Sequence, residues 1–514
     1  MLLGLDYGTT TTLAFSWMDE GLREQARILS SVFIDANGRI LTDEDAYRNR
    51  TSQTGKYCHS PKSLLGKVNM FADSASLAGE DPRKLICATL TTVFESLSLQ
   101  DGEDIRITLT VPNAWRDRQY ILMRECVFRT ADKAFGSRFN KEHFAIIPEP
   151  VAAALHFIIN KPVDGTVDTN YAIICDIGGG TTDLAVVRCD KFVEGDVTDL
   201  RFEVICPMEG APGLGGDNFD KALKEFFFPN GVPAEVPDHI LWNTIRAVKA
   251  QLSRQATATF PLLNAKGDIL KDARKKDVFL HCTQAQFEQV IRDYLVRIRA
   301  MLEQLKEKLL DYDPHCDLSK VYLLPVGGSC RIPAIRTILK DVFKADLTDM
   351  DNELNETYDS IASGAAYYTA WMSKGIKGYR NIKIVNHLPH RLAIRHSVNT
   401  LETWIEKNSP DGTYSPTILR PVRMNPDGKT FRIGCISLFQ GEGSFVDPAR
   451  NELLLEIDID EPVYAHGRSL DEIPIVMEIT IATSRIRRIR LVVENGREDG
   501  SDFEYEESFN LEVR

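Results

Sequence analysis

The sequence is short of three features that would each indicate a class of protein. No stretch reaches the roughly 18 uncharged apolar residues that a membrane-spanning helix needs. Basic residues are outnumbered, and the formal net charge of −13 argues against general nucleic-acid binding. The ten cysteines lie far apart without a Cys-x-x-Cys motif, and Cys175 and Cys206 lie in apolar runs. We therefore expect no membrane and no nucleic-acid partner, and cysteines that are reduced core residues, which suits a cytoplasmic location.

A signal peptide and a histidine metal site are also not expected. Residues 1–4 lead directly into a glycine-rich turn, which leaves no room for a signal peptide. His387, His390 and His396 could suggest a metal, but they lie in a strand-turn region without a cysteine partner. With 43% apolar and 26% charged residues among 514, the chain has the composition of an ordinary globular protein of roughly two to four domains.

A glycine-rich turn near residue 178 is the most informative part of the sequence. Residues 171–175 form an apolar run, and Asp176, three glycines, two threonines and Asp183 follow in that order. This pattern predicts a strand, a tight turn and a returning strand. Glycines let backbone approach a bulky anion, and threonine hydroxyls can donate to phosphate oxygens. Asp176 and Asp183 would repel phosphate unless a divalent cation or an attacking water lies between. A plain hairpin is the alternative.

The same order of residues occurs near the N-terminus. Residues 5–15 contain an aspartate, a glycine, a run of threonines, then Leu-Ala and an apolar residue. A motif that recurs about 170 residues later predicts two related lobes, each offering one phosphate loop to a shared cleft. A third glycine turn at 327–333 follows the apolar run 321–326 and precedes a helical pattern at 334–343. Glycines before a helix N-terminus suit an anion or a nucleoside.

On these motifs the chain resembles the seventy-kilodalton heat-shock chaperones of the DnaK type, within the actin-like ATPase superfamily. The loop at Asp6 resembles their first phosphate motif, 176–183 the second, 327–333 the adenosine motif and 147–154 the connecting segment. The resemblance covers nearly the whole chain and is weaker in its C-terminal part. It implies an α/β fold, in which a two-lobed actin-like (ribonuclease-H-like) ATPase domain is followed by a C-terminal all-β sandwich.

The resemblance also implies the domain boundaries. Residues 1–374 are expected to form the ATPase domain, 375–386 the linker, and 387–514 a substrate- or partner-binding β-sandwich without the family's helical lid. The Gly/Lys-rich residues 373–378 are of the flexible kind, whereas 380–386 can still add to the ATPase domain as a strand through the backbone and Ile382, Ile384 and Val385. Residues 494–507 are expected to form a loop before a final strand at 509–513. Period-two patterns predict other strands of the sandwich at 431–436, 453–459 and 475–481.

Several elements are predicted from periodicity. Helices are expected at 117–134, 151–159, 241–253, 284–310 and 359–372, and strands of the ATPase domain at 105–111 and 144–147. In the sandwich, a row of arginines could meet an anionic partner, but it is more typical of the solvated face of a strand. The row consists of Arg485, Arg487, Arg488 and Arg490.

The resemblance implies ATP or ADP as the nucleotide and Mg²⁺ as the metal, with K⁺ as a further candidate ion. The catalytic residues by this match are Lys62, Glu149, Asp176, Thr181 and Asp183. The metal would be held through water by Asp6, Asp176 and Glu149. Lys62 matches the family's catalytic lysine, with a surface lysine as the alternative. Glu149 lies between two prolines and is expected at a fixed turn, with a helix-start acid as the alternative.

The nucleotide-binding residues implied by the same match come from several segments. They are Asp6, Gly8, Thr9, Thr10, Thr11, Gly178, Gly179, Gly180, Gly215, Gly216, Asp217, Lys249, Ser253, Gly327, Gly328, Ser329 and Arg331. Two positions depart from the family pattern. Ala250 stands where a ring-stacking arginine is expected, and Arg246 stands where a glutamate is expected. Adenine selectivity therefore stays open.

We expect a slow ATPase of the chaperone type, a monomer that binds peptide or protein clients through its β domain. A small-molecule kinase and a filament-forming protein of the same superfamily are alternatives, but neither accounts for a β domain. A nucleotide-gated binding module with negligible turnover is a third alternative, which Ala250 and Arg246 favour. In the family, J-domain partners dock through an arginine and an asparagine. Ala145 and Pro148 stand at those positions, so we expect weak or no stimulation by a J-domain partner.

Overall fold

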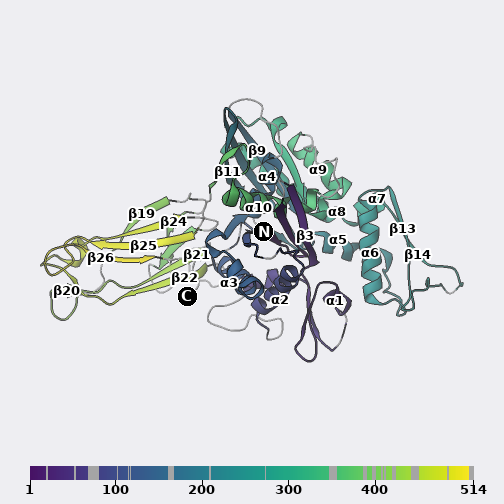
Figure 1. Cartoon of the computed structure of the whole chain (residues 1–514), viewed down its shortest axis with the longest axis horizontal. Coiled ribbons are helices and arrows are strands. Elements are labelled where there is room, and N and C mark those ends of the chain that lie inside the picture. The colour runs from purple at the N-terminus through teal and green to yellow at the C-terminus, as the bar shows by residue number, and fades with distance from the viewer. Residues whose placement is uncertain are drawn as a thin grey trace. The chain divides into compact units, whose positions relative to one another are not determined.

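The computed structural model describes residues 1–18, 21–50, 52, 54–67, 80–100, 102–113, 115, 117–159, 167–207, 210–272, 274–345, 356–385, 391–395, 401–406, 409, 412–419, 424–441, 451–482 and 485–508. The chain divides into two compact units (Figure 1). Unit 1 comprises Met1–Asn113 and Leu122–Ile384, and unit 2 comprises Ala114–Ile121 and Val385–Arg514. The three histidines considered as a metal site, His387, His390 and His396, lie outside the described residues.

Two sheets of unit 1 share one plan. Their strand orders are β3-β2-β1-β7-β8 and β15-β9-β10-β11-β16. In each, an antiparallel hairpin (β1–β2 or β9–β10) has a parallel strand beside its first strand and an antiparallel strand beside its second. The first sheet consists of β1 (Leu2–Tyr7), β2 (Thr11–Met18), β3 (Gly21–Leu29), β7 (Arg106–Val111) and β8 (Ala145–Pro148). The second consists of β9 (Val167–Ile177), β10 (Thr181–Glu194), β11 (Val197–Pro207), β15 (Tyr322–Val326) and β16 (Tyr379–Val385), and short β12 (Ala211–Pro212) also pairs with β10. The predicted two-lobed α/β fold is confirmed.

Helices α4 (Glu149–Ile159) and α10 (Glu356–Lys374) pack against one another between these sheets. Their backbones come so close that a Cβ on Gly364 would lie 1.9 Å from the Ala152 carbonyl oxygen. A Cβ on Gly4 of β1 would lie 2.2 Å from the Ala362 carbonyl oxygen. Only glycine permits both approaches. The close packing joins the two lobes through a small-residue core.

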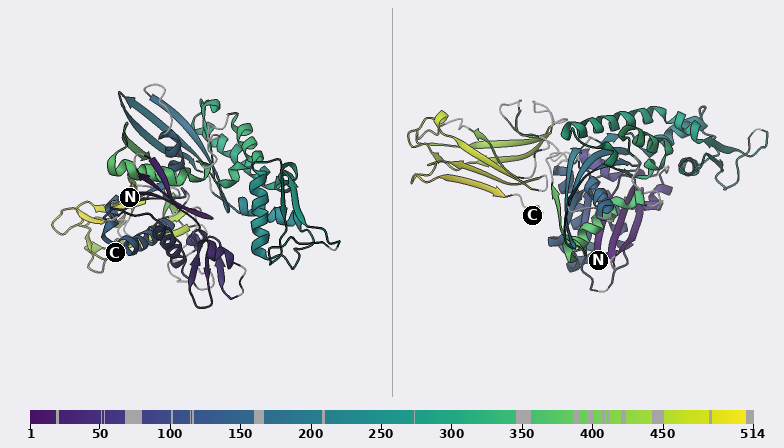
Figure 2. Two further views of the ribbon diagram at one scale, coloured as in Figure 1. Left: turned by 45° about the vertical axis from the view of Figure 1, so that its right-hand side comes forward. Right: turned by 90° about the horizontal axis from the view of Figure 1, so that it is seen from above.

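Two smaller sheets and the remaining helices complete unit 1. The strands are β4 (Val32–Ile34), β5 (Ile40–Thr42) and β6 (Lys56–Cys58) in one sheet, and β13 (Thr257–Pro261) and β14 (Phe279–Thr283) in a hairpin. The helices are α1 (Asp43–Arg48), α2 (Pro82–Glu95), α3 (Asp117–Phe135), α5 (Gly216–Phe227), α6 (Asp238–Leu252), α7 (Gln284–Val290), α8 (Arg292–Tyr312) and α9 (Pro333–Phe343). Figure 2 shows the β13–β14 hairpin next to α6 in two further views. Among the described residues, none of the helices is long and apolar enough to span a bilayer.

The helix predicted at 284–310 is two helices. A capping box at Thr283 starts α7, in which Thr283 Oγ1 accepts from the Gln286 N–H and the Gln286 side chain accepts from the Thr283 N–H. Ile291, with ψ near 11°, interrupts the helical backbone, and its side chain is fully buried in the core. The apolar pattern continues through this break, so periodicity alone did not reveal it.

Unit 2 is a sandwich of two antiparallel sheets, as predicted. The sheets have the orders β18-β17-β21-β22 and β19-β24-β25-β26, and side chains from both form one core. The strands are β17 (Arg391–Arg395), β18 (Leu401–Ile405), β19 (Gly412–Leu419), β21 (Gly434–Gly441), β22 (Asn451–Ile459), β24 (Ile475–Ala482), β25 (Arg485–Val493) and β26 (Phe503–Ser508). Short β20 (Thr430–Phe431) and β23 (Val463–Tyr464) pair with each other.

Two expectations for the sandwich need correction. The strand expected at 431–436 is divided between β20 and β21. The segment 494–507, expected to be a loop, contains most of β26, which pairs with β25 and buries Phe503. Its glutamates alternate with Phe503 and Tyr505, so one face of an acidic strand still reaches the core. The strand expected at 509–513 lies outside the described residues.

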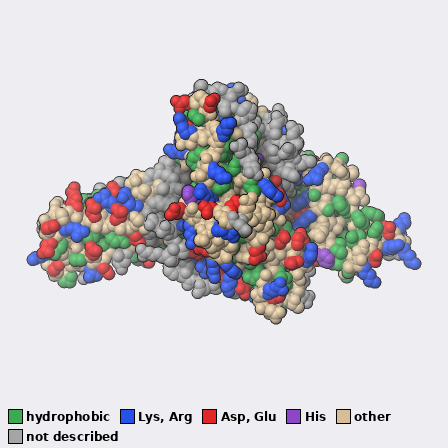
Figure 3. All heavy atoms as spheres, in the orientation of Figure 1, with side chains coloured by type: hydrophobic (Ala, Val, Ile, Leu, Met, Phe, Trp, Pro, Cys, Tyr) green, Lys and Arg blue, Asp and Glu red, His purple; other side chains and the backbone are tan. Residues whose placement is uncertain are grey.

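Two arginines of the row on β25, Arg488 and Arg490, are paired within their own sheet. Arg490 lies 3.2 Å from Glu478 and 2.6 Å from Glu504, and Arg488 lies 3.6 Å from Glu506. Acidic and basic side chains are correspondingly interspersed on the face shown in Figure 3. The pairing supports the solvated strand face over an anionic partner.

Within the linker segment 375–386, the strand addition considered for 380–386 is present. Helix α10 ends at Lys374, and β16 begins at Tyr379 and hydrogen-bonds to β11 at the edge of the second sheet. Ile382 of this strand is buried, and the Tyr379 hydroxyl donates to the Ile159 carbonyl oxygen. The strand is thus part of unit 1 and is held by backbone pairing and apolar burial.

Candidate functional site

The two predicted phosphate loops face one another. Each is the turn of a central hairpin, β1–β2 or β9–β10, so the like topology of the lobes places both turns at corresponding positions. A Cβ on Gly179 would lie 2.1 Å from Thr10 Oγ1, and one on Gly180 would lie 3.2 Å from Thr9 Cγ2. A side chain at either glycine would therefore fill the space between the loops.

The second loop is fixed by segments far away in the sequence. The backbone N–H groups of Gly216 and Asp217 donate to the carbonyl oxygens of Gly178 and Gly179, at 2.9 and 2.8 Å. The Ser329 hydroxyl donates to the Gly178 carbonyl oxygen at 3.0 Å. Residues 213–217, the glycine loop and the predicted adenosine motif therefore form one neighbourhood.

Lys62 and Glu149 form a buried ion pair at 2.7 Å. Lys62 comes from the 3₁₀ helix η1 (Pro61–Lys67), and Glu149 is the first residue of α4. Burial lowers the pKa of Lys62, but the carboxylates of Glu149 and Asp6 more than offset it, so the net shift is upward. Lys62 is 7% exposed, so the surface-lysine alternative is wrong. The helix-start position of Glu149 agrees with its predicted place outside a helix interior.

Three aspartates share this site with Lys62, of which Asp6 is buried and Asp176 and Asp183 are half-buried. Burial and then Glu149 raise the pKa of Asp6 to about 7, although Lys62 and a 3.1 Å hydrogen bond from Thr110 act in the opposite direction. Burial and Glu149 raise the pKa of Asp183 to about 6. Burial raises the pKa of Asp176 well above its usual value, and the neighbouring carboxylates add to the shift. The single positive charge of Lys62 does not neutralise the negative charge of these acids, so the site favours an added cation.

The donor set suits a hydrated magnesium ion. Carboxylate oxygens are hard ligands of the kind that Mg²⁺ takes, and Mg²⁺ usually keeps several waters. Within the described residues, no three acidic, histidine or cysteine side chains converge closely enough to ligate an ion directly. Among the described residues, Thr10 Oγ1 in the first phosphate loop is buried and has no hydrogen-bond partner. Both observations fit a phosphate whose metal is held through water.

The residues of α6 that are expected to lie near the adenine base form an ion-pair network with α5. Lys249 Nζ lies 2.8 Å from Asp220 Oδ1 and donates to the Gly216 carbonyl oxygen at 2.8 Å. Arg246 lies 3.6 Å from Asp217 and 3.5 Å from Asp220. The Ser253 hydroxyl donates to the Lys249 carbonyl oxygen within the helix end. Arg246, which replaces the expected glutamate, thus interacts with acids of α5.

The first lobe contributes residues to this network that sequence reasoning missed. His59 Nε2 lies 2.7 Å from Asp217 Oδ2. Burial raises the pKa of Asp217, but the His59 hydrogen bond together with the positive charges of His59, Arg246 and Lys249 outweighs burial and holds the pKa at about 2. The Tyr47 ring lies under the Arg246 guanidinium at 4.9 Å. The Arg50 guanidinium donates to the Asp238 carbonyl oxygen at 3.0 Å. These contacts link the lobes beside the site, and no motif in the sequence marks them.

The remaining predicted residues lie around the loops. A Cβ on Gly8 would lie 2.2 Å from the Thr11 carbonyl oxygen, so this turn is tight. Gly327 has φ +78°, and a Cβ there would lie 2.6 Å from Asp176 Oδ1. A Cβ on Gly215 would lie 2.6 Å from the Gly179 carbonyl oxygen. Thr181 starts β10, and Gly328 and Arg331 begin and end the 3₁₀ helix η5 (Gly328–Arg331).

Comparison with known proteins gives one consistent result. A family model described as Hsp70 protein matches residues 106–480. A chaperone protein dnaK of Cyanidioschyzon merolae is 26% identical over 461 residues, which cover 81% of this chain and 68% of the relative. A chaperone protein HscA homolog of Methylococcus capsulatus is 27% identical over 497 residues, covering 89% and 71%. One of Bordetella petrii is 25% identical over 495 residues, covering 90% and 72%.

Proposed function

Since the chain belongs to the Hsp70 family, we propose that it is a chaperone of the Hsp70 type that binds ATP with Mg²⁺ between its two lobes and slowly hydrolyses it. The observation that carries the ATPase activity is the buried Lys62–Glu149 pair next to Asp6, Asp176 and Asp183. A buried lysine among four acids has no evident use in a binding module alone, whereas phosphoryl transfer needs charges placed around a phosphate.

In this proposal the chain positions the γ-phosphate and a water. The Thr9 and Thr10 hydroxyls and the backbone of the 178–181 turn donate to phosphate oxygens. Lys62 stabilises the negative charge that develops in the transition state. Asp183, with a pKa raised to about 6 by burial and Glu149, orients the attacking water and can accept its proton near neutral pH.

The metal belongs to the same proposal. Asp6, Asp176 and Glu149 would hold Mg²⁺ through water, and the bound ion would neutralise phosphate charge. Its positive charge would also lower the pKa of Asp6 and Asp176, whose upward shifts come from burial and from the neighbouring acids. The two aspartates thereby stay ionised at neutral pH.

The β-sandwich would bind extended peptide or protein segments, with only weak control by the nucleotide. This role rests on the family and on the sandwich fold of unit 2. A nucleotide-gated binding module with negligible turnover is a second candidate. This candidate is favoured by Arg246, which stands where a glutamate near the adenine base is expected. Arg246 instead forms ion pairs with Asp217 and Asp220.

A single-turnover hydrolysis assay separates the two candidates. The full chain is mixed in excess over radiolabelled ATP with Mg²⁺, with and without an unfolded peptide, and ADP formation is followed. The proposal predicts conversion of the bound ATP within minutes to hours and a faster rate with peptide. Tight ATP binding without ADP formation would instead support the gated module.

A further inference from the structure

Two cysteines lie side by side in the first lobe, apart from the nucleotide site. Cys87 is on α2 and Cys126 on α3. The Cys87 sulfur lies 3.8 Å from the Cys126 carbonyl oxygen. The Cys126 sulfur lies 3.8 Å from the carbonyl oxygen of Arg83, one turn before Cys87 on the same helix. Each thiol therefore lies against the backbone of the helix that carries the other.

The two thiols have different environments. Cys87 is half-buried, whereas Cys126 is 1% exposed. The neighbouring Cys126 thiol lowers the pKa of Cys87 to about 6, against the effect of burial, and Arg129 adds to the lowering. The neighbouring Cys87 thiol, together with burial, raises the pKa of Cys126. A thiolate is the nucleophilic form of cysteine, so Cys87 is the reactive member at neutral pH.

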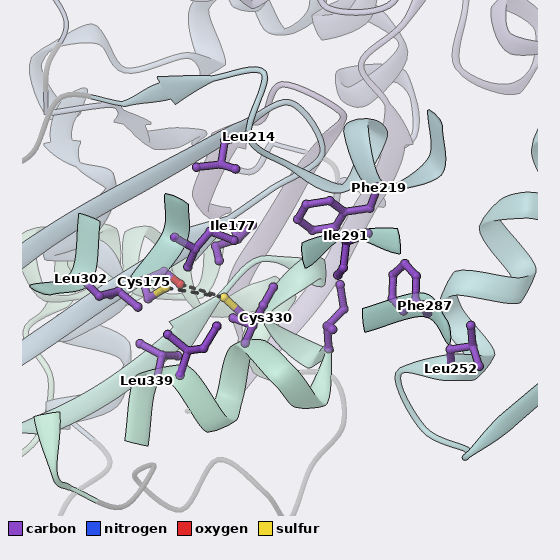
Figure 4. Close-up of a cluster of buried hydrophobic side chains, with 14 of the residues drawn as sticks. Cys175, Ile177, Leu214, Phe219, Leu252, Phe287, Ile291, Leu302, Cys330 and Leu339 are labelled. Carbon is purple, nitrogen blue, oxygen red and sulfur yellow. Dashed lines mark hydrogen bonds between the residues drawn. The ribbon is translucent and has the colours of Figure 1, made fainter. Parts of the chain in front are cut away.

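A second cysteine pair in the chain differs from this one in exposure and in pKa. The sulfurs of Cys175 and Cys330 lie 4.0 Å apart, and Cys330 also donates to the Cys175 carbonyl oxygen at 3.1 Å (Figure 4). Both side chains are fully buried in the apolar core, and the pKa of Cys175 is raised well above its usual value by Cys330 and by burial. Proximity alone therefore does not make a reactive pair in this chain.

We propose that Cys87 and Cys126 are an oxidisable pair, in which Cys87 reacts with hydrogen peroxide and Cys126 resolves the product to a disulfide. The Cys87 thiolate attacks one peroxide oxygen, the O–O bond breaks, and the released hydroxide takes up a proton to become water. Cys126, losing its proton, then attacks the Cys87 sulfur of the sulfenic acid. The S–S bond forms, the S–O bond breaks, and a second water leaves. The two thiols lose two electrons, which the peroxide gains.

The pair lies near Tyr7, which precedes the first phosphate loop in the sequence. Tyr7, the last residue of β1, precedes Gly8, and its hydroxyl is close to the sulfurs of Cys126, Cys58 and Cys87. A bond between α2 and α3 would act on the packing of this buried tyrosine. Cys58 is the one other described cysteine in this neighbourhood, and a test must distinguish it from Cys126 as the resolving thiol.

The test is limited oxidation of the full chain. The protein is treated with about one equivalent of hydrogen peroxide, free thiols are blocked with N-ethylmaleimide, and non-reduced peptides are mapped by mass spectrometry. We expect a Cys87–Cys126 linked peptide, with the Cys175 and Cys330 peptides fully alkylated after unfolding. The exposed Cys435 is an internal reference for accessibility and should remain largely reduced.

Two variants assign the roles. In Cys126→Ser, Cys87 should accumulate as a sulfenic acid that dimedone traps. In Cys58→Ser, the Cys87–Cys126 link should form as in the parent chain. A link from Cys87 to Cys58, oxidation of Cys435 ahead of Cys87, or an unmodified Cys87 would each overturn the proposal. Because these readings use mass alone, they do not depend on whether the chain hydrolyses ATP.

Discussion

Lys62 is the residue on which the proposed hydrolysis most directly depends. Its ammonium group is the one positive charge that the described residues place among the buried acids of the site. We expect Lys62→Ala to slow single-turnover hydrolysis roughly 10²–10³-fold, because a group aimed at developing charge is lost. ATP binding, measured by calorimetry, should change far less. Lys84→Ala, which removes an exposed lysine of α2, is the matched control and should keep the parent rate.

Asp6 is expected to make the folding stability of the nucleotide-free chain depend on pH. Its folded-state pKa of about 7 exceeds the unfolded value of 3.8, because burial and Glu149 disfavour the charged form. The folded state therefore binds a proton more tightly, and this contribution to stability is present below pH 3.8 and is lost as the pH rises through 7. We expect Asp6→Asn to reduce the loss of thermal stability between pH 4 and pH 7.

The check is the melting temperature of both chains across that range, without nucleotide or metal. At pH 7 the asparagine chain should be the more stable, by an amount on the order of a few kcal/mol, since each unit of pKa difference corresponds to about 1.4 kcal/mol. Equal pH profiles for the two chains would show that Asp6 is ionised in the folded protein.

At the level of single residues, the sequence predicted what lies in contiguous motifs. The aspartates, the glycines and the threonines of the two loops are recognisable because the turn itself dictates residue types at fixed spacing. His59, Tyr47 and Asp220 were not predicted, because their partners are up to 199 positions away and only folding brings them together. Arg246 was seen as a departure, but its acidic partners were visible only in the structure.

Strand β16 is the element whose stability is most open to test. Arg380 lies 2.6 Å from Asp199 and 3.0 Å from Glu194, but these pairs are solvent-exposed and contribute little. Ile382 is buried at 3% exposure and packs on the core of the second lobe. Edge-strand backbone pairing and apolar packing, with Ile382 buried and Tyr379 and Ile384 packed beside it, are therefore the main source of docking.

We expect Ile382→Ala to weaken the docked strand by about 2 kcal/mol, the lower end of the cost of truncating a buried isoleucine. Hydrogen exchange of the amides at 379–385 should speed up by more than tenfold in this variant. Lys383→Ala, which changes the exposed neighbour, is the matched control. Equal protection in the two variants would contradict the role of the buried side chain.

At the level of elements, periodicity located strands and helices but not their interruptions. Predicted ends of α3, α9 and β22 agree with the structure within about two residues, the ordinary uncertainty of such boundaries. The break at Ile291 and the strand β26 were missed. In both cases a buried side chain, Ile291 or Phe503, is placed by packing that a local pattern does not contain.

At the scale of the whole molecule, internal repetition was the strongest predictor. Two hairpins with the same residue order predicted two lobes, and the structure has two sheets with the same neighbours in the same directions. The switch from helical to period-two patterns predicted a separate β domain, and the family resemblance implied that this domain is a sandwich. Repetition did not predict the close packing of α4 against α10, which depends on the single glycine Gly364 at their contact.

The effect of the bound nucleotide on peptide release depends on both domains and on the linker between them. Arg380 and Lys383 make the linker basic, and its ion pairs to the second lobe are exposed. A strand held by edge pairing and a small apolar contact offers little free energy for a nucleotide to redirect. We therefore expect ATP and ADP to change peptide dissociation only a few-fold, corresponding to about 1 kcal/mol or less. The measurement is fluorescence anisotropy of a labelled unfolded peptide released from the full chain in each nucleotide. Ile382→Ala should remove the remaining difference, and a hundred-fold difference in the parent chain would refute weak coupling.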